Sequence, residues 1–172
     1  MEKRLEHFLR SATEHGWKIV QKAQPNLTLC REVSQRFPVL PDDYRYFLER
    51  VASCANAGQT VWFNCEGEFN GDVPELAFPW NDFEKMSSEW SEGDEQVTRF
   101  WANHLPIMMS VHGDYAYVAL QYEGDQCRSV VWGWAPEFEE ASVCAETFAE
   151  FIDRLTVAIR DGSDSGLIAS FL

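Results

Sequence analysis

The chain has 172 residues and a formal net charge of −14, and 45% of its residues are hydrophobic. A chain of this length usually forms one domain around one core. Its negative charge repels nucleic-acid phosphates and anionic lipids and attracts cationic proteins. No apolar run approaches the roughly 18 residues that a membrane span needs. We therefore expect a basic protein partner, no nucleic acid and no membrane, with the homo-oligomeric state open.

The first residues predict an amphipathic helix, with Leu5, Phe8 and Leu9 on one face. A secretory signal would show a continuous apolar core instead, so we expect a cytoplasmic protein. The five cysteines are odd in number and form no CxxC pair. Neither a disulfide framework nor a zinc site is indicated, and we expect reduced, mostly buried thiols.

Residues 29–37 predict a second helix. The segment from Leu40 to Val51 predicts a third helix, which begins at Leu40-Pro41. Pro41 suits the first helical position because its missing N–H would have no partner there, and Asp42 and Asp43 oppose the positive end of the helix dipole. The apolar residues then recur at i, i+3, i+4 and i+7, which indicates one buried face. That face consists of Tyr44, Phe47, Leu48 and Val51.

Residues 64–95 carry ten acids and a single base, Lys85. Residues 64–100 lack a clear period and predict an irregular segment, with one helical turn near 94–101, whose aromatic residues need burial. We consider two interpretations, a solvated acidic face that keeps the protein soluble and a docking surface for a cationic partner. The candidate partner-binding residues are Glu66, Glu68, Asp72, Glu75, Trp80, Asp82, Glu84 and Trp90.

The last third of the chain predicts strands and a closing helix. Strands are expected at 60–63, 107–111, 115–122 and 128–134, with short polar turns that favour an antiparallel meander. Trp132 and Trp134 share one face of their strand, and we expect both to lie in the core under a helix. Thr147 and Glu150 predict a capping box at the start of a helix over 147–160. The fold class is therefore α+β: a single domain with an antiparallel sheet of about four or more strands, flanked by N-terminal helices and a C-terminal helix.

Three segments together resemble a known family. They are FPVLPDDYRYFLERV at 37–51, GDYAYVAL at 113–120 with SVVWGW at 129–134, and CAETFAEFIDRL at 144–155. In order and spacing they resemble the SUKH superfamily, of the Smi/Knr cell-wall-assembly-regulator type. The resemblance covers residues 29–160 and implies one SUKH-like domain over 1–172. The acidic segment 64–100 is longer and more aromatic than the family pattern, like an insertion.

The resemblance implies a binding protein. Bacterial members of the superfamily are widely found as immunity proteins that neutralise polymorphic toxins, often nucleases, and fungal members act as regulatory scaffolds. The leading hypothesis is a cytosolic immunity protein. The alternatives are a regulatory scaffold or peptide-binding module without a toxin partner, and an uncharacterised enzyme or metal protein.

Catalytic signals are weak. The sequence contains no GxxxxGK[ST], HExxH or GxSxG motif. His104, His112 and Asp114 could surround a metal ion, but a metal site needs three or four converging ligands at fixed spacing. We expect no catalytic residue, no metal and no cofactor.

Overall fold

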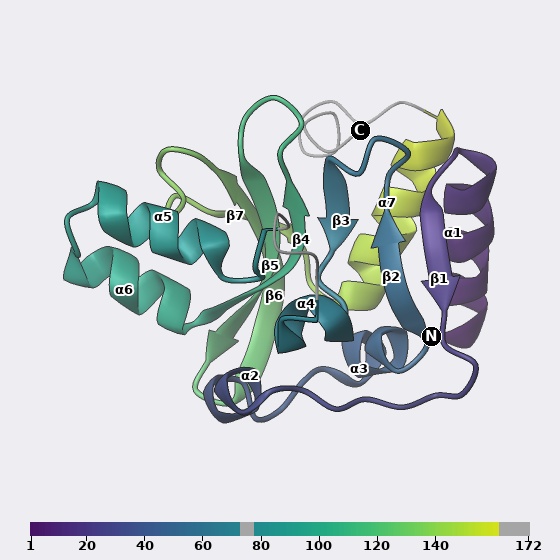
Figure 1. The fold of residues 1–172 in the computed structure, drawn as a ribbon, viewed down its shortest axis with the longest axis horizontal. Helices are drawn as coiled ribbons and strands as arrows, with labels where there is room; N and C mark the ends of the chain where they lie inside the picture. The colour runs from purple at the N-terminus through teal and green to yellow at the C-terminus, as the bar shows by residue number, and fades with distance from the viewer. Residues whose placement is uncertain (73–77, 162–172) are drawn as a thin grey trace.

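A computed structural model describes residues 1–72 and 78–161, which form one antiparallel sheet with helices on both faces (Figure 1). The strands are β1 (Lys18–Gln21), β2 (Val51–Ala55), β3 (Val61–Phe63), β4 (His104–Ser110), β5 (Ala116–Glu123), β6 (Gln126–Trp134) and β7 (Ser142–Ala145). The helices are α1 (Glu2–Glu14), α2 (Arg31–Arg36), α3 (Asp42–Leu48), α4 (Glu66–Asn70), α5 (Asp82–Trp90), α6 (Glu95–Ala102) and α7 (Phe148–Asp161). The predicted α+β class, with N-terminal helices and a C-terminal helix, is confirmed.

The strand order is β1-β2-β3-β4-β5-β6-β7, so every strand pairs with its neighbour in sequence. Such a meander needs only short connections where no helix intervenes. The helices α1 and α7 lie side by side on one face, whereas α5 and α6 lie on the other (Figure 1). The central strands are therefore buried on both sides.

Successive side chains of the central strands lie in different hydrophobic cores, one on each face of the sheet. Met108 and Val130 belong to the larger core, under α1, α3 and α7, and Met109 and Val131 belong to the smaller core, under α5 and α6. This is the period of two that a strand imposes on its side chains. Because both faces are apolar, β4 is buried along its whole length.

Aromatic rings fill the centre of the larger core. Phe47 of α3 lies 5.0 Å from Phe63 of β3 and 5.4 Å from Phe148 of α7, measured between ring centroids. All three side chains are buried. Tyr44 stays with them because its hydroxyl donates a hydrogen bond to the carbonyl oxygen of Asn64, at 3.0 Å. A buried hydroxyl without such a partner would destabilise the fold.

Asp43 joins the start of α3 to the start of α7. One carboxylate oxygen accepts the N–H of Ala149 at 2.8 Å, and the other accepts the N–H of Tyr44 at 2.9 Å. Thr147 adds a further cap, since its hydroxyl oxygen accepts the N–H of Glu150 at 3.1 Å. The first N–H groups of a helix have no partner within the helix. The two segments shared with the SUKH superfamily, LPDDY and TFAEF, thus meet through one carboxylate.

We expect Asp43→Ala to lower the free energy of unfolding by about 1–2 kcal/mol, because two N–H groups lose their acceptor. Asp42→Ala is the matched control. Asp42 is exposed and makes no side-chain hydrogen bond within the described residues, so its loss should change stability by about 0.5 kcal/mol or less. Urea unfolding followed by circular dichroism measures both. Equal losses for the two variants would contradict the bridging role of Asp43.

Two predictions of secondary structure are wrong. The described part of residues 64–100 is not irregular before the predicted turn near 94–101, which α6 confirms: it also contains α4 and α5, whose short lengths and mixed polarity hide the helical period. Val51 is not the last member of the α3 face, because α3 ends at Leu48 and Val51 begins β2. A buried apolar residue fits either element, and a β-branched one favours the strand. The short edge strands β1 and β7 were also missed, since each has only four residues.

The prediction that Trp132 and Trp134 both lie in the core is correct only in part. Trp132 is half-buried at the margin of the larger core, but Trp134 is 45% exposed. Trp134 is the last residue of β6 and pairs with Ala116, the first of β5, so it lies at the end of the sheet. The two rings contact each other, with centroids 4.7 Å apart.

All five cysteines are free thiols, and Cys54, Cys65 and Cys144 are buried. Burial raises the pKa of Cys144 to about 12 and that of Cys127 to about 11, so both are protonated at neutral pH. Among the described residues, no helix is long and apolar enough to cross a membrane.

Candidate partner-binding surface

Glu66, the first residue of α4, is used within the fold. Its carboxylate forms an ion pair with Lys22 and accepts the N–H of Thr28 at 2.8 Å. Burial favours the neutral form, but the Lys22 ammonium and the Thr28 N–H outweigh burial and hold the pKa of Glu66 below its usual value. Glu66 thereby fastens the segment after β1 to α4, and little of its charge is left for a partner.

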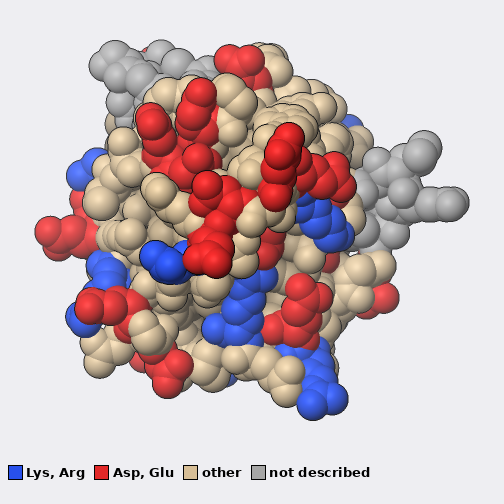
Figure 2. Space-filling view, turned by 90° about the vertical axis from the view of Figure 1, so that its left-hand side faces the viewer, with Lys and Arg blue, Asp and Glu red and all other residues tan. Residues whose placement is uncertain are grey.

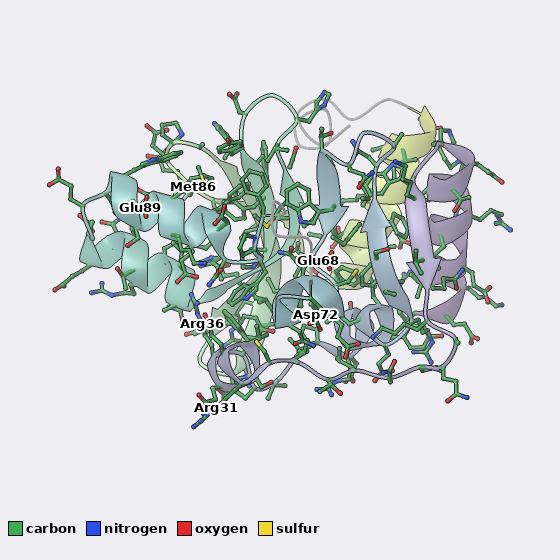
Figure 3. All side chains as sticks on the ribbon, in the orientation of Figure 1. Arg31, Arg36, Glu68, Asp72, Met86 and Glu89 are labelled. Atoms are coloured by element: carbon green, nitrogen blue, oxygen red, sulfur yellow. The ribbon has the colours of Figure 1, made fainter. Side chains whose placement is uncertain are left out.

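Glu68 lies on the same helix in a different environment. Its side chain accepts the N–H of Cys65 at 2.9 Å, as the acid of a capping box. Burial raises the pKa of this carboxyl above its usual value. Asp72, just after the end of α4, is exposed (Figure 3). Of these two candidates, only Asp72 is open to a partner.

The opposite shifts predict opposite pH dependences for two variants. Glu66 stabilises the fold above its unfolded pKa, so the advantage of the parent over Glu66→Gln should be constant down to about pH 5 and should shrink as the pH falls further. Glu68 is penalised when charged, so the stability of the parent relative to Glu68→Gln should rise as the pH falls from about 7 to about 4. Urea unfolding at several pH values measures both. The same trend for both variants would contradict these environments.

Arg36 of α2, which is labelled in Figure 3, contacts two further candidates, Glu84 and Trp80. Its guanidinium donates two hydrogen bonds of 2.9 Å to the carboxylate of Glu84 and contacts the carbonyl oxygen of Trp101. It also lies 5.8 Å from the ring centroid of Trp80. Trp80 is only 4% exposed and packs against Phe69. Trp80 is therefore part of the larger core and is not open to a partner in this structure, and Glu84 is already paired.

The remaining two acidic candidates are Asp82 and Glu75. Asp82, the first residue of α5, is half-buried. Glu75 lies outside the described residues.

Trp90, the last residue of α5, is 52% exposed. It is the outer member of four parallel rings, which we call the ring stack. Trp90 lies 5.7 Å from Phe138 at 19°, Phe138 lies 5.4 Å from Phe83 at 22°, and Phe83 lies 5.5 Å from Tyr115 at 18°. Phe138 and Phe83 are fully buried. The stack thus extends from the smaller core to the surface and holds Trp90 firmly.

Acidic residues lie in the segments that carry Trp90 and Phe138. They come from the end of α5, the turn into α6 and the β6–β7 loop, which the contact between Trp90 and Phe138 brings together. The Trp90 surface is defined as Trp90, Glu89, Glu92, Asp94, Glu95, Glu137, Glu139 and Glu140. Figure 2 looks onto this side of the molecule and shows acidic side chains across its upper half.

Most carboxylates of this surface have no cationic partner. Asp94 caps α6 by accepting the N–H of Gln96 at 2.6 Å. The six glutamates form no ion pair within the described residues, and all except the half-buried Glu139 are exposed. On α5, Met86 packs against the smaller core, whereas Glu89 is open to solvent (Figure 3). The surface therefore combines an exposed aromatic ring with uncompensated negative charge.

Sequence reasoning missed Glu137, Glu139 and Glu140. The segment Pro136–Glu140 mixes acids with Phe138, as the segment 64–95 mixes acids with aromatic residues. That composition was the available signal. Only the fold shows that Phe138 meets Trp90 and that the two acidic segments form one surface.

The histidines show no catalytic arrangement. His104 is buried against the Phe100 ring, with Nδ1 2.6 Å from the Phe100 carbonyl oxygen, and burial lowers its pKa. His112 is exposed in the β4–β5 turn. In the part of the chain that the structure describes, no three His, Cys, Asp or Glu residues converge as metal ligands would.

Fold and surface together define an acidic α+β domain whose exposed side chains suit contact with another protein. The sequence model of the SMI1 / KNR4 family (SUKH-1) matches residues 30–154, and the chain belongs to this family. The match includes the LPDDY segment and the first turns of α7, which confirms the resemblance to the SUKH superfamily. No curated protein and no solved structure matches the chain.

Proposed function

We propose that the chain is a cytosolic immunity protein that neutralises a bacterial toxin by binding it through the Trp90 surface. The observation that carries the proposal is the exposed Trp90 among glutamates that have no ion pair within the described residues. The family includes toxin immunity proteins. Aromatic residues at the centre of an interface supply most of its affinity, and surrounding charges supply specificity and fast association.

The charge of the surface favours a nuclease as the toxin. A nuclease needs a basic surface to hold the phosphates of its substrate. An acidic inhibitor is steered onto that surface and blocks it. Asp72 and Asp82 extend the proposed contact region, whereas Glu66, Glu68 and Glu84 serve the fold.

The test uses the neighbouring gene, which this proposal expects to encode a large secreted protein with a C-terminal toxic domain. Cells that produce this domain should grow when they also produce the chain. Growth should fail with a variant in which Glu89, Glu139 and Glu140 are each changed to Lys. Because each reversal changes the charge by two units, steering should be lost together with the local contacts.

A matched control separates local charge from total charge. The exposed acids Glu2, Glu6 and Glu14 of α1 can be changed to Lys, which gives the same net charge on a different element. This variant should still protect. Equal loss of protection by both variants, or protection by both, would contradict the proposed surface. Circular dichroism of both variants checks that they fold.

A regulatory or peptide-binding role is the second candidate, and one observation favours it. A hollow of about 300 Å³ lies beside the β4–β5 turn. Its lining includes Trp132, Trp134 and Ala116. The hollow is lined by two tryptophans together with His112 and Asp114, so it would bind a partner with less dependence on salt than the Trp90 surface, where the acids are many. The effect of salt on binding therefore separates the two candidates.

A further inference from the structure

The ring stack ends at the surface with one ring open. Within residues 1–72 and 78–161, Phe138 is the one aromatic ring in contact with Trp90, and half of the Trp90 side chain is exposed. The inner members of the stack follow one another at 5.4–5.7 Å with nearly parallel planes. A further planar group could therefore continue the stack on the outer face of Trp90.

We propose that this outer face seats an arginine side chain of the basic partner. The inference rests on the proposed function and specifies the chemistry of its central contact. A guanidinium is planar, so it stacks on the indole, and it is cationic, so the neighbouring carboxylates attract it. Glu89 precedes Trp90 in α5, and Glu139 follows Phe138 in the β6–β7 loop.

The chain already contains this combination twice. Arg36 lies over Trp80 at 5.8 Å while its guanidinium pairs with Glu84 at 2.9 Å. Arg50 lies over Tyr46 at 3.5 Å and contacts Glu49 at 3.2 Å. In both cases one guanidinium combines an aromatic face with a carboxylate. The Trp90 surface supplies the ring and the carboxylates but no arginine from its own chain.

Two other occupants fit less well. A lysine ammonium is a compact, strongly hydrated charge that has no plane to stack and gains less from the indole face. A nucleic-acid base is planar, but its phosphates would enter a field of unpaired carboxylates. Arginine is the group that satisfies both the ring and the charge.

The test compares a short arginine–glycine repeat peptide with the lysine–glycine peptide of the same length and charge, by calorimetric titration at low salt. The arginine peptide should bind the parent chain about fivefold more tightly than the lysine peptide. Trp90→Ala should remove this preference, and Trp90→Phe should keep part of it. Trp134→Ala is the comparison, because Trp134 is an exposed tryptophan outside the Trp90 surface and lines the hollow of the second candidate, so it separates the two sites.

The outcomes distinguish this inference from the proposed function. Equal binding of both peptides, lost at high salt, would overturn arginine recognition and leave the acidic docking surface standing. A loss in Trp134→Ala as large as in Trp90→Ala would also overturn it. No binding of either peptide would overturn both proposals. Tighter binding of a single-stranded oligonucleotide than of the arginine peptide would show that Trp90 stacks on bases instead.

Discussion

Gly133→Ala is expected to lower the free energy of unfolding by about 3 kcal/mol, a large loss for a single added methyl group. A Cβ at this position of β6 would lie 2.7 Å from the hydroxyl oxygen of Tyr117 and 2.9 Å from its Cε1 atom. Tyr117 is fully buried, and its hydroxyl donates a 2.5 Å hydrogen bond to the carbonyl oxygen of Phe138. The ring therefore cannot move aside without disturbing the β6–β7 loop.

Urea unfolding measures this loss, and Gly58→Ala is the control. A Cβ at Gly58 would meet the Thr60 side chain at 3.6 Å, an ordinary contact distance. We expect a change of about 0.5 kcal/mol or less for the control. Since Phe138 supports Trp90, Gly133→Ala should also weaken partner binding. A stability close to that of the parent would show that Tyr117 has more freedom than its surroundings indicate.

Arg36→Ala is expected to cost about 2–3 kcal/mol, because it leaves the partly buried carboxylate of Glu84 without its cation. The carbonyl oxygen of Trp101 loses a donor, and the Trp80 ring loses its cover. Through these contacts Arg36 ties α2 to both α5 and α6. Loss of the tie should loosen α5, which carries Trp90.

Two further variants show whether charge or geometry matters. Arg36→Lys keeps the charge but cannot form the two-pronged contact, so we expect it to recover less than half of the loss. Arg31→Ala removes an exposed arginine from the same helix and should change stability by about 0.5 kcal/mol or less. Unfolding curves for all three variants make the comparison. Equal stability of Arg36→Ala and Arg31→Ala would mean that the contacts of Arg36 contribute nothing to the free energy of unfolding.

Parts of the fold with regular local patterns could be predicted from sequence. The strands β5 and β6 are runs rich in β-branched and aromatic residues joined by a short turn, and α7 has a long apolar face with a cap at its start. The role of Asp43 could not be predicted in the same way. Its charge fits the dipole of its own helix, and nothing local indicates that Ala149 of a distant helix shares the same carboxylate.

The candidate surface could be predicted only in outline. Trp80 and Trp90 lie in the same acidic segment, and acids follow both of them closely in the sequence. The difference arises from their places in the fold, because Trp80 lies in the larger core against Phe69 and Arg36, whereas Trp90 ends α5 at the surface. Likewise Glu66 and Glu84 find cationic partners far away in sequence, whereas Glu89 finds none in the described chain. Composition therefore predicted an acidic, aromatic region, but the fold separates its structural members from its exposed ones.

Docking through the Trp90 surface is tested most directly by the rate at which the chain associates with the toxin domain. Stopped-flow mixing at low salt should show binding at least about tenfold slower for Glu89→Lys/Glu139→Lys/Glu140→Lys than for the parent. Salt should slow the parent strongly and this variant weakly. The α1 variant, Glu2→Lys/Glu6→Lys/Glu14→Lys, should stay near the parent rate. Equal rates for the two triple variants would contradict docking at the Trp90 surface.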